Sequence, residues 1–179
     1  MEDAVAGFQE GLNEGLGDRS PMFLAVMDHD LQSLNFWINM GVDVDKRDPY
    51  EQTVLHYAAA EGKPEFVRIV LEHGASVDVQ DQCGGTPLIR AAEKNCLTCV
   101  RLLIEAGADV NLVNEDGHGP MIAAIHEDNP QILRMLLEAG ADPMRTCVND
   151  HNALDHAKYA DAELAHRDAM VNLIEQYMD

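Results

Sequence analysis

The chain has 179 residues, a length that suits one ordinary domain and falls short of two. It carries 12 Lys and Arg against 32 Asp and Glu, which gives a formal net charge of −20. This charge argues against direct binding of nucleic acid or of an anionic lipid surface, because both would repel the chain over a long range.

The sequence also predicts an intracellular protein. Its uninterrupted apolar stretches are far shorter than the roughly 20 residues that cross a bilayer, so we expect no membrane insertion. Residues 1–3 are Met-Glu-Asp, acidic where a secretory signal would be basic and then apolar. Four cysteines, Cys83, Cys96, Cys99 and Cys147, fit a reducing compartment better than a disulfide framework. We therefore expect a cytoplasmic or nuclear location.

The sequence repeats itself with a period of 33 residues. Glycines and alanines mark this period, at Gly41, Gly74, Gly107 and Gly140 and at Ala25, Ala58, Ala91, Ala124 and Ala157. Such a period indicates a solenoid of stacked units. Five repeats fit, at about 15–47, 48–80, 81–113, 114–146 and 147–179. Residues 1–14 form an acidic lead, either a short helix or disordered.

Each repeat predicts two short antiparallel helices. Repeat one places Phe36 and Trp37 in its second helix, as suits an end unit with one neighbour. In repeat three, Thr86 is a good N-cap and Pro87 suits the first helical position. Apolar residues at helical spacing follow, and Gly107 then stands where a left-handed residue would end the second helix. Repeat five has four extra residues, as expected of a C-terminal cap.

Repeat three resembles the ankyrin repeat. The matching residues are Asp81, Gly84, Thr86-Pro87-Leu88, Ala91-Ala92, Leu102-Leu103 and Gly107-Ala108-Asp109-Val110-Asn111. The resemblance extends over all five repeats and implies an all-α solenoid of stacked antiparallel helix pairs with hairpin loops. It also implies a non-enzymatic protein, an adaptor or scaffold that binds another protein through a concave inner face and through its hairpins.

The repeat register assigns candidate partner-binding residues to this inner face and to the hairpins. They are Tyr50, Gln52, Tyr57, Glu61, Arg90, Glu93, Lys94, Glu115, Asp116, His118, His126 and Glu127. Tyrosine and arginine are favoured interface anchors, and carboxylates steer a basic partner. We therefore expect a protein partner with a basic or mixed basic and apolar surface, and a chain that is monomeric by itself. The alternative is that the carboxylates only keep the stack in solution.

Two other functions remain open from the sequence. The chain could inhibit one specific enzyme, as small ankyrin inhibitors of cyclin-dependent kinases do. It could instead be a metal- or redox-dependent protein that uses His118, His126, His151 and the cysteines of repeats three to five. His118 and His151 are equivalent residues of neighbouring repeats, and His126 and His156 are expected on the inner face. Repeat spacing does not guarantee the convergence that a zinc site needs. We therefore expect solvated histidines, no metal and no cofactor.

Two further motifs have a structural and a chemical interpretation. The pair Cys96 and Cys99 is a C-x-x-C without a second pair, so the sequence favours apolar filler over a redox or metal pair. His56 follows Thr53-Val54-Leu55, and the ankyrin resemblance implies that it hydrogen-bonds within the turn framework.

Asn111 is a candidate for hydroxylation. Leu103 lies eight residues before it and Asp109-Val110 precede it directly. This arrangement is similar to the ankyrin hairpin sites modified by the animal asparaginyl hydroxylase that also acts on hypoxia-inducible factor. The alternative is an ordinary turn asparagine that bonds the backbone of its own hairpin.

Overall fold

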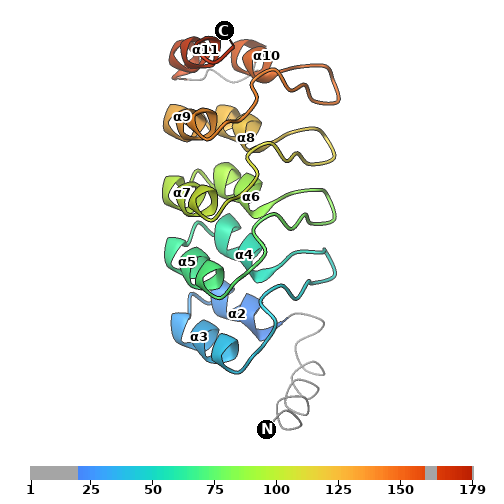
Figure 1. Cartoon of the computed structure of the whole chain (residues 1–179), viewed down its shortest axis with the longest axis vertical. Helices are drawn as coiled ribbons and strands as arrows, with labels where there is room; N and C mark the ends of the chain where they lie inside the picture. Colours follow the sequence, from blue (N-terminus) through green and yellow to red (C-terminus); the bar gives the residue numbers. More distant parts are fainter. Residues whose placement is uncertain (1–19, 160–164, 179) are drawn as a thin grey trace.

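The computed structural model describes residues 20–159 and 165–178. In this part of the chain there are ten α-helices and no strand. The helices form five pairs stacked along one axis, with a loop projecting sideways between successive pairs (Figure 1). The expected all-α solenoid is therefore confirmed. The predicted lead at residues 1–14 lies outside the described residues.

The two helices of a pair differ in length, with seven residues in the first and nine in the second. The first helices are α2 (Pro21–Met27), α4 (Val54–Ala60), α6 (Pro87–Glu93), α8 (Pro120–His126) and α10 (Ala153–Tyr159). The second helices are α3 (Leu31–Asn39), α5 (Pro64–Glu72), α7 (Leu97–Glu105), α9 (Pro130–Glu138) and α11 (Arg167–Glu175). Helix α11 begins four residues later than the 33-residue period requires, as the sequence of repeat five predicts.

Side-chain caps fix where several helices begin. Thr86 Oγ1 accepts a hydrogen bond from the backbone N–H of Ile89 at 3.2 Å, and Pro87 follows at the first helical position. Asp30 accepts from two backbone N–H groups at the start of α3, and Asn129 does the same for α9. Each cap satisfies amides that have no partner within the helix.

A glycine ends the second helix of four repeats. Gly107 has φ of +89°, and the other three members of its 33-residue series also have positive φ. A Cβ atom at Gly107 would meet no atom within 4 Å, so the backbone conformation alone favours glycine there. The predicted left-handed ends of these helices are confirmed.

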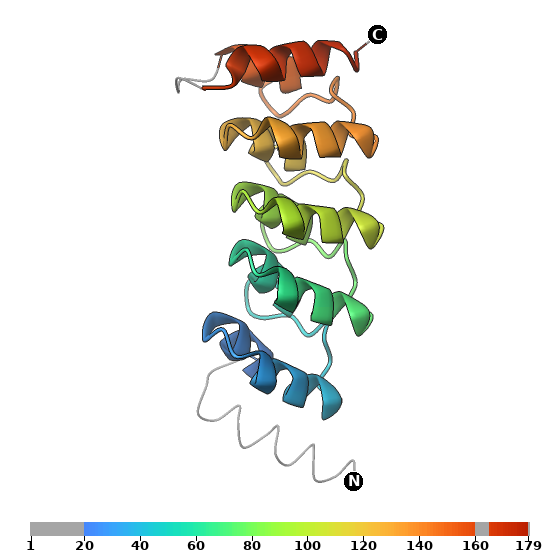
Figure 2. The ribbon, with the colours of Figure 1, turned by 90° about the vertical axis from the view of Figure 1, so that its left-hand side faces the viewer.

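The core lies between the two helices of each pair and between neighbouring pairs. Met22, Leu55, Leu88 and Met121 occupy equivalent positions of the first helices, and all four side chains are buried. The first helices keep small residues, such as Ala58 and Ala91, where they pack against their neighbours. The second helices stack along one side of the molecule, in the view of Figure 2.

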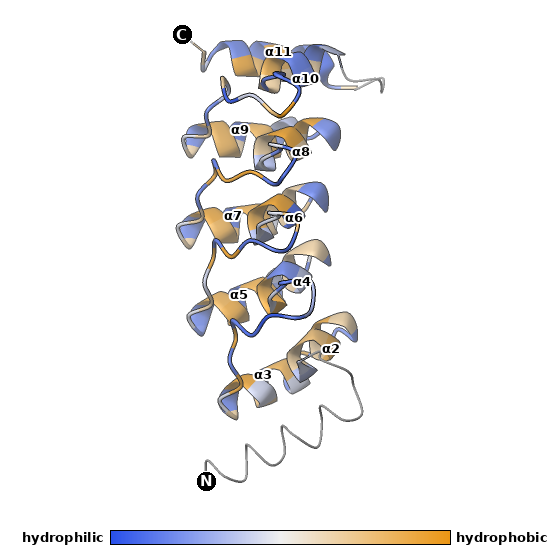
Figure 3. Ribbon diagram, turned by 90° about the vertical axis from the view of Figure 1, so that its right-hand side faces the viewer, coloured by the Kyte–Doolittle hydropathy of each residue, from blue (hydrophilic) through white to orange (hydrophobic). Residues whose placement is uncertain are grey.

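The loops between pairs are hairpins that project past the first helices, and their residues are mainly hydrophilic (Figure 3). Successive hairpins are joined by one backbone hydrogen bond that recurs with the repeat. Gln82 N donates to Tyr50 O at 3.0 Å, Glu115 N to Cys83 O at 3.0 Å, and Val148 N to Asp116 O at 3.1 Å. None of the helices in the described residues is long and apolar enough to span a membrane.

Candidate functional site

The inner face is defined here as the surface formed by the first helices and the hairpins. Eight of the twelve candidate partner-binding residues are exposed on it, namely Tyr50, Glu61, Glu93, Lys94, Glu115, Asp116, His126 and Glu127. The other four are half-buried, namely Gln52, Tyr57, Arg90 and His118. The two groups have different environments, because the half-buried side chains of Gln52, Tyr57 and Arg90 form hydrogen bonds within the protein.

An acidic residue at the base of a hairpin organises the junction between repeats two and three. Asp81 Oδ1 accepts hydrogen bonds from the backbone N–H groups of Cys83 and Gly85, at 3.0 and 2.8 Å. Its Oδ2 accepts from Arg90 Nη2 at 2.5 Å and from Gln52 Nε2 at 3.2 Å. Gln52, Asp81 and Arg90, called here the Asp81 network, therefore join two hairpins and a helix.

Repeat two has the same construction with a different donor. Asp48 Oδ1 accepts from the backbone N–H groups of Tyr50 and Gln52, and its Oδ2 accepts from the hydroxyl of Tyr57 at 2.8 Å. The Tyr57 ring also lies 4.9 Å from that of Phe23, centroid to centroid. Tyr57 and Arg90 thus contribute to the scaffold of the inner face.

Burial and hydrogen bonding set the charges around the Asp81 network. Burial on its own raises the pKa of Asp81, but hydrogen bonds from Arg90, Gln52 and Gly85 outweigh it, and the net pKa is lowered. Burial lowers the pKa of His56, whose Nε2 lies 3.1 Å from Gly85 O. Its Nδ1 accepts from Thr53 N at 3.1 Å. A neutral imidazole with the proton on Nε2 satisfies both contacts, as the expected turn framework requires.

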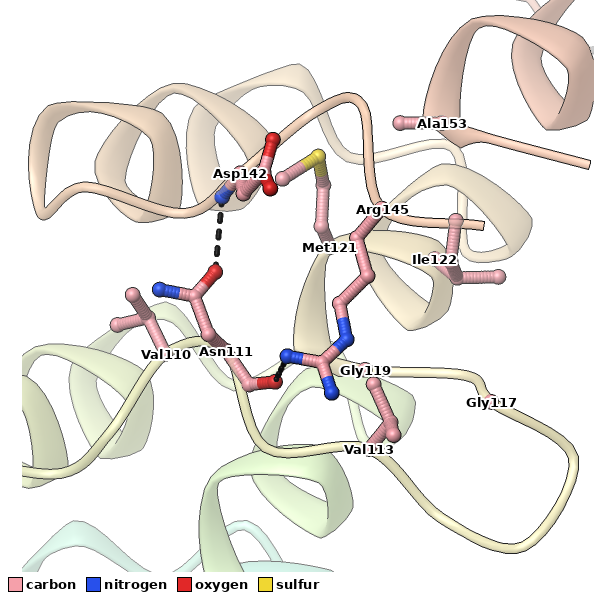
Figure 4. A pocket seen from close by; sticks show the side chains of 10 residues that line it. All are labelled: Val110, Asn111, Val113, Gly117, Gly119, Met121, Ile122, Asp142, Arg145 and Ala153. Carbon is pink, nitrogen blue, oxygen red and sulfur yellow. Dashed lines mark hydrogen bonds between the residues drawn. The ribbon is translucent and has the colours of Figure 1, made fainter. Parts of the chain in front are cut away.

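Asn111 lies in a small pocket of ≈ 30 Å³ between repeats three and four (Figure 4). Its Oδ1 accepts from Asp142 N at 2.8 Å, its Nδ2 donates to Gly140 O at 3.1 Å, and its carbonyl accepts from Arg145 Nη1 at 2.8 Å. The side chain is therefore bonded to the next repeat, beyond its own hairpin. Hydroxylation of Asn111 stays a prediction, and the modifying enzyme would have to reach a side chain held at both polar atoms.

The two cysteines of the C-x-x-C lie at the start of α7. Cys96 is the N-cap, and its Sγ accepts from the backbone N–H of Cys99 at 3.3 Å. Cys99 is fully buried. Burial raises the pKa of the Cys99 thiol, which favours the protonated form and disfavours nucleophilic chemistry.

Four histidines gather between repeats four and five. We call His118, His126, His151 and His156 the histidine cluster, and their ring centroids are 5.1 to 5.9 Å apart in four pairs. His126 Nε2 and His156 Nδ1 are 3.2 Å apart, which is hydrogen-bond distance. A hollow of ≈ 250 Å³ on the inner face is lined by His118 and His126, among others.

The buried thiol of Cys147 lies beside two of these histidines. A ring nitrogen of His118, a ring nitrogen of His156 and Sγ of Cys147 all lie within 4.8 Å of one another. Within the described residues, Nε2 of His156 is buried and has no hydrogen-bond partner. Burial, followed by repulsion from His126 and His118, lowers the pKa of His156 to about 4, so its ring is neutral near pH 7. The expectation of solvated histidines agrees with the exposure of His126 and His151, whereas His118 and His156 are half-buried and lie beside the Cys147 thiol.

The repeat register indicates that His118, Cys147 and His156 lie close together, although their residue types alone do not. His118, Cys147 and His156 each lie 66 residues, or two repeats, after Gln52, Asp81 and Arg90. The equivalence of His118 and His151 follows from one 33-residue period, whereas the match of these three positions with the Asp81 network spans two periods.

Comparison with known proteins agrees with this architecture. A family model described as ankyrin repeats in three copies matches residues 22–114 and 74–147, which together span most of the chain. The chain belongs to the ankyrin repeat family. A search of curated proteins finds no match to the chain. Ankyrin repeats generally mediate protein–protein interactions, and the family is typically non-enzymatic.

Proposed function

We propose that this ankyrin repeat protein is a non-enzymatic adaptor that binds a protein partner through its inner face. The partner has a basic or mixed basic and apolar surface. The observation that carries the proposal is a set of exposed groups on the inner face: a tyrosine on one hairpin, two carboxylates on another hairpin, and a line of carboxylates along the ends of the first helices.

The tyrosine and two of the carboxylates lie on the hairpins. Tyr50 and Asp116 occupy equivalent positions two repeats apart, and Glu115 precedes Asp116. Tyr50 is 57% exposed, and its backbone N–H donates a hydrogen bond to Asp48. An aromatic side chain on a fixed backbone loses little conformational freedom on binding, which favours its use as an anchor.

A line of three carboxylates follows the ends of the first helices. Glu61, Glu93 and Glu127 are exposed at the last residue or the C-cap of α4, α6 and α8. Among the ion pairs of the described residues, only Glu93 of these carboxylates takes part, with Arg90 at 3.1 Å. Carboxylates without an internal cation are available to a cationic partner and accelerate its association.

The test compares two triple charge reversals of equal size. Glu61→Lys, Glu115→Lys and Asp116→Lys change the inner face, and the control changes Glu72, Glu105 and Glu138 to Lys on the second helices. Both sets raise the net charge by the same amount. The immobilised variants and the unchanged chain are used to capture proteins from a lysate of the source cells.

We expect the inner set to weaken capture of the specific partner by roughly 1–3 kcal/mol, and the outer set to leave it unchanged. Added salt should slow association more than it speeds dissociation. Loss of capture with the outer set and retention with the inner set would contradict the proposal.

A single variant separates the anchor from the scaffold. Tyr50→Ala should weaken capture while the helical spectrum and the melting temperature stay the same, because the side chain is exposed. Tyr57→Ala should lower the melting temperature, because it removes the bond to Asp48 and the contact with Phe23. The identity of the captured protein then distinguishes an adaptor from an inhibitor, since an inhibitor retains one enzyme and lowers its activity.

A further inference from the structure

We propose that His118, Cys147 and His156 form a binding site for one Zn²⁺ ion between repeats four and five. The site does not depend on the protein-binding proposal, because none of its three ligands is among the tyrosine and carboxylates that carry that proposal. Three observations support it: the convergence of the three side chains, the environment of His156, and the repeat register.

The distances are close to those of a zinc site. Zinc binds histidine nitrogen at about 2.0–2.1 Å and cysteine sulfur at about 2.3 Å, so the ligand atoms of a tetrahedral site are about 3.3–3.6 Å apart. The nitrogen atoms of His118 and His156 and the sulfur of Cys147 lie within 4.8 Å of one another. These separations exceed the ideal ones by at most about 1.2–1.5 Å, and side-chain rotations that close this difference bring the three atoms onto one ion.

The hydrogen bonding of His156 prepares one ring nitrogen for a metal. His156 Nδ1 faces Nε2 of His126 at 3.2 Å. In the tautomer in which Nδ1 carries the proton and donates it to His126, the lone pair of His156 is on Nε2. That atom is buried and has no hydrogen-bond partner in the part of the chain described. Metal-binding histidines characteristically donate their other N–H to a neighbouring acceptor, which fixes the ring and the tautomer.

The register shows that these three positions bring side chains together. In repeats two and three they hold Gln52, Asp81 and Arg90, whose polar atoms are joined through Asp81 at 2.5 and 3.2 Å. Two repeats later the same positions hold three residues that all donate lone pairs to transition metals. The backbone also packs closely here, because a Cβ atom on Gly117 would lie 2.8 Å from Cys147 Cα. The hairpin of repeat four is thus held against the cysteine.

The ligand chemistry selects the ion. Two imidazoles and a thiolate suit Zn²⁺, whereas Ca²⁺ and Mg²⁺ take oxygen ligands. Binding transfers the Cys147 thiol proton to solvent and forms the sulfur–zinc bond, while the neutral imidazoles bind through their lone pairs. Asp155 and Glu127 add negative charge near the histidines. Three protein ligands leave a fourth position for water.

The experiment titrates the reduced, metal-free full chain with Co²⁺ and then with Zn²⁺. We expect visible absorption of tetrahedral Co²⁺ and a near-ultraviolet thiolate-to-cobalt band, both saturating at one ion per chain. Stoichiometric Zn²⁺ should remove both signals and raise the melting temperature. Saturation with a weak octahedral spectrum and no thiolate band would overturn the proposal.

Three ligand variants take their new residues from other repeats of the same protein, so that each suits its position. Cys147→Asn and His156→Ala each introduce the residue that occupies the same position in repeat four. His118→Gln introduces the residue that occupies the same position in repeat two. We expect Cys147→Asn to abolish the thiolate band. Each histidine variant should weaken Zn²⁺ binding more than about 100-fold, since even the loss of an outer-shell partner costs 10–100-fold. If Cys147→Asn failed to fold, the two histidine variants would decide.

The controls address the other thiols and the outer shell. Cys83→Ser changes an exposed thiol, and Cys96→Ser keeps an N-capping residue at the start of α7. Both should retain the thiolate band and the affinity. His126→Ala should weaken binding by about 10–100-fold, through its contact with His156. A thiolate band that persists in Cys147→Asn, or that disappears in Cys96→Ser, would overturn the assignment.

Discussion

The Asp81 network and the zinc site proposed here occupy the same three positions of the stack, two repeats apart. At the junction of repeats two and three, Asp81 accepts hydrogen bonds from two side chains and two backbone amides. At the junction of repeats four and five, Cys147 lies beside two imidazoles, one of which has a buried nitrogen without a hydrogen-bond partner in the described residues. One backbone geometry can thus hold either a satisfied polar network or a set of metal ligands, and the side chains decide which.

Of the changes compared here, removal of the Asp81 carboxylate should lower the free energy of unfolding the most. Asp81→Ala leaves half-buried Arg90 without a carboxylate at this contact and two hairpin amides without their acceptor. We expect a loss of about 3 kcal/mol in the free energy of unfolding, measured by urea denaturation.

The matched change at the other junction is Cys147→Ala. In zinc-free solution it removes a small buried apolar side chain, and we expect a loss of about 1 kcal/mol. Equal losses for Asp81→Ala and Cys147→Ala would contradict this difference, because they would show that the two positions contribute to stability in the same way.

Exchange of the side chains should convert one junction into the other. The triple variant His118→Gln, Cys147→Asp and His156→Arg places the Asp81 network between repeats four and five. We expect it to raise the free energy of unfolding by about 1 kcal/mol in zinc-free solution, because a new charge-assisted network forms. It should also abolish the stabilisation by Zn²⁺. A variant that is less stable than the unchanged chain would mean that the two junctions differ in backbone geometry.

A smaller effect should appear in the pH dependence. His56 packs against the first junction, where burial lowers its pKa, Asp81 opposes that shift and Arg90 adds to it. As the pH falls below about 6.5, the unfolded chain takes up a proton that folded His56 does not bind, so stability decreases. One such proton changes stability by at most about 1.4 kcal/mol per pH unit.

His56→Gln isolates this contribution. Glutamine suits the third helical position of a capping box and does not titrate. In the presence of a chelator, we expect its stability to fall less steeply than that of the unchanged chain between pH 7 and pH 5, by urea denaturation. Identical slopes would show that His56 does not control this dependence.

Much of the fold could be predicted from the sequence because its signals are local and recur. The spacing of Gly74, Gly107 and Gly140 predicts where three helices end, and Thr86-Pro87 predicts where one begins. Both results follow from backbone geometry within a few residues. The family could be predicted for the same reason, because the ankyrin sequence pattern consists of such recurring glycines and helix starts.

The site was harder to predict because it depends on contacts between repeats. Arg90 is an apt interface residue by type, yet the structure pairs it with Asp81. For Asn111, the alternative to hydroxylation was a side chain that bonds its own hairpin, but this side chain bonds Gly140 and Asp142 of the next repeat. Side-chain direction, which the repeat period does not specify, decides these contacts. Comparison of residues two repeats apart would have indicated the position of Cys147.

The most direct test of the shared geometry is X-ray absorption spectroscopy at the zinc edge of the chain loaded with one Zn²⁺. We expect one sulfur ligand at about 2.3 Å and nitrogen ligands at about 2.0–2.1 Å, as supplied by Cys147 with His118 and His156. A first shell without sulfur, or one with two sulfurs as the pair Cys96 and Cys99 would supply, would contradict this expectation.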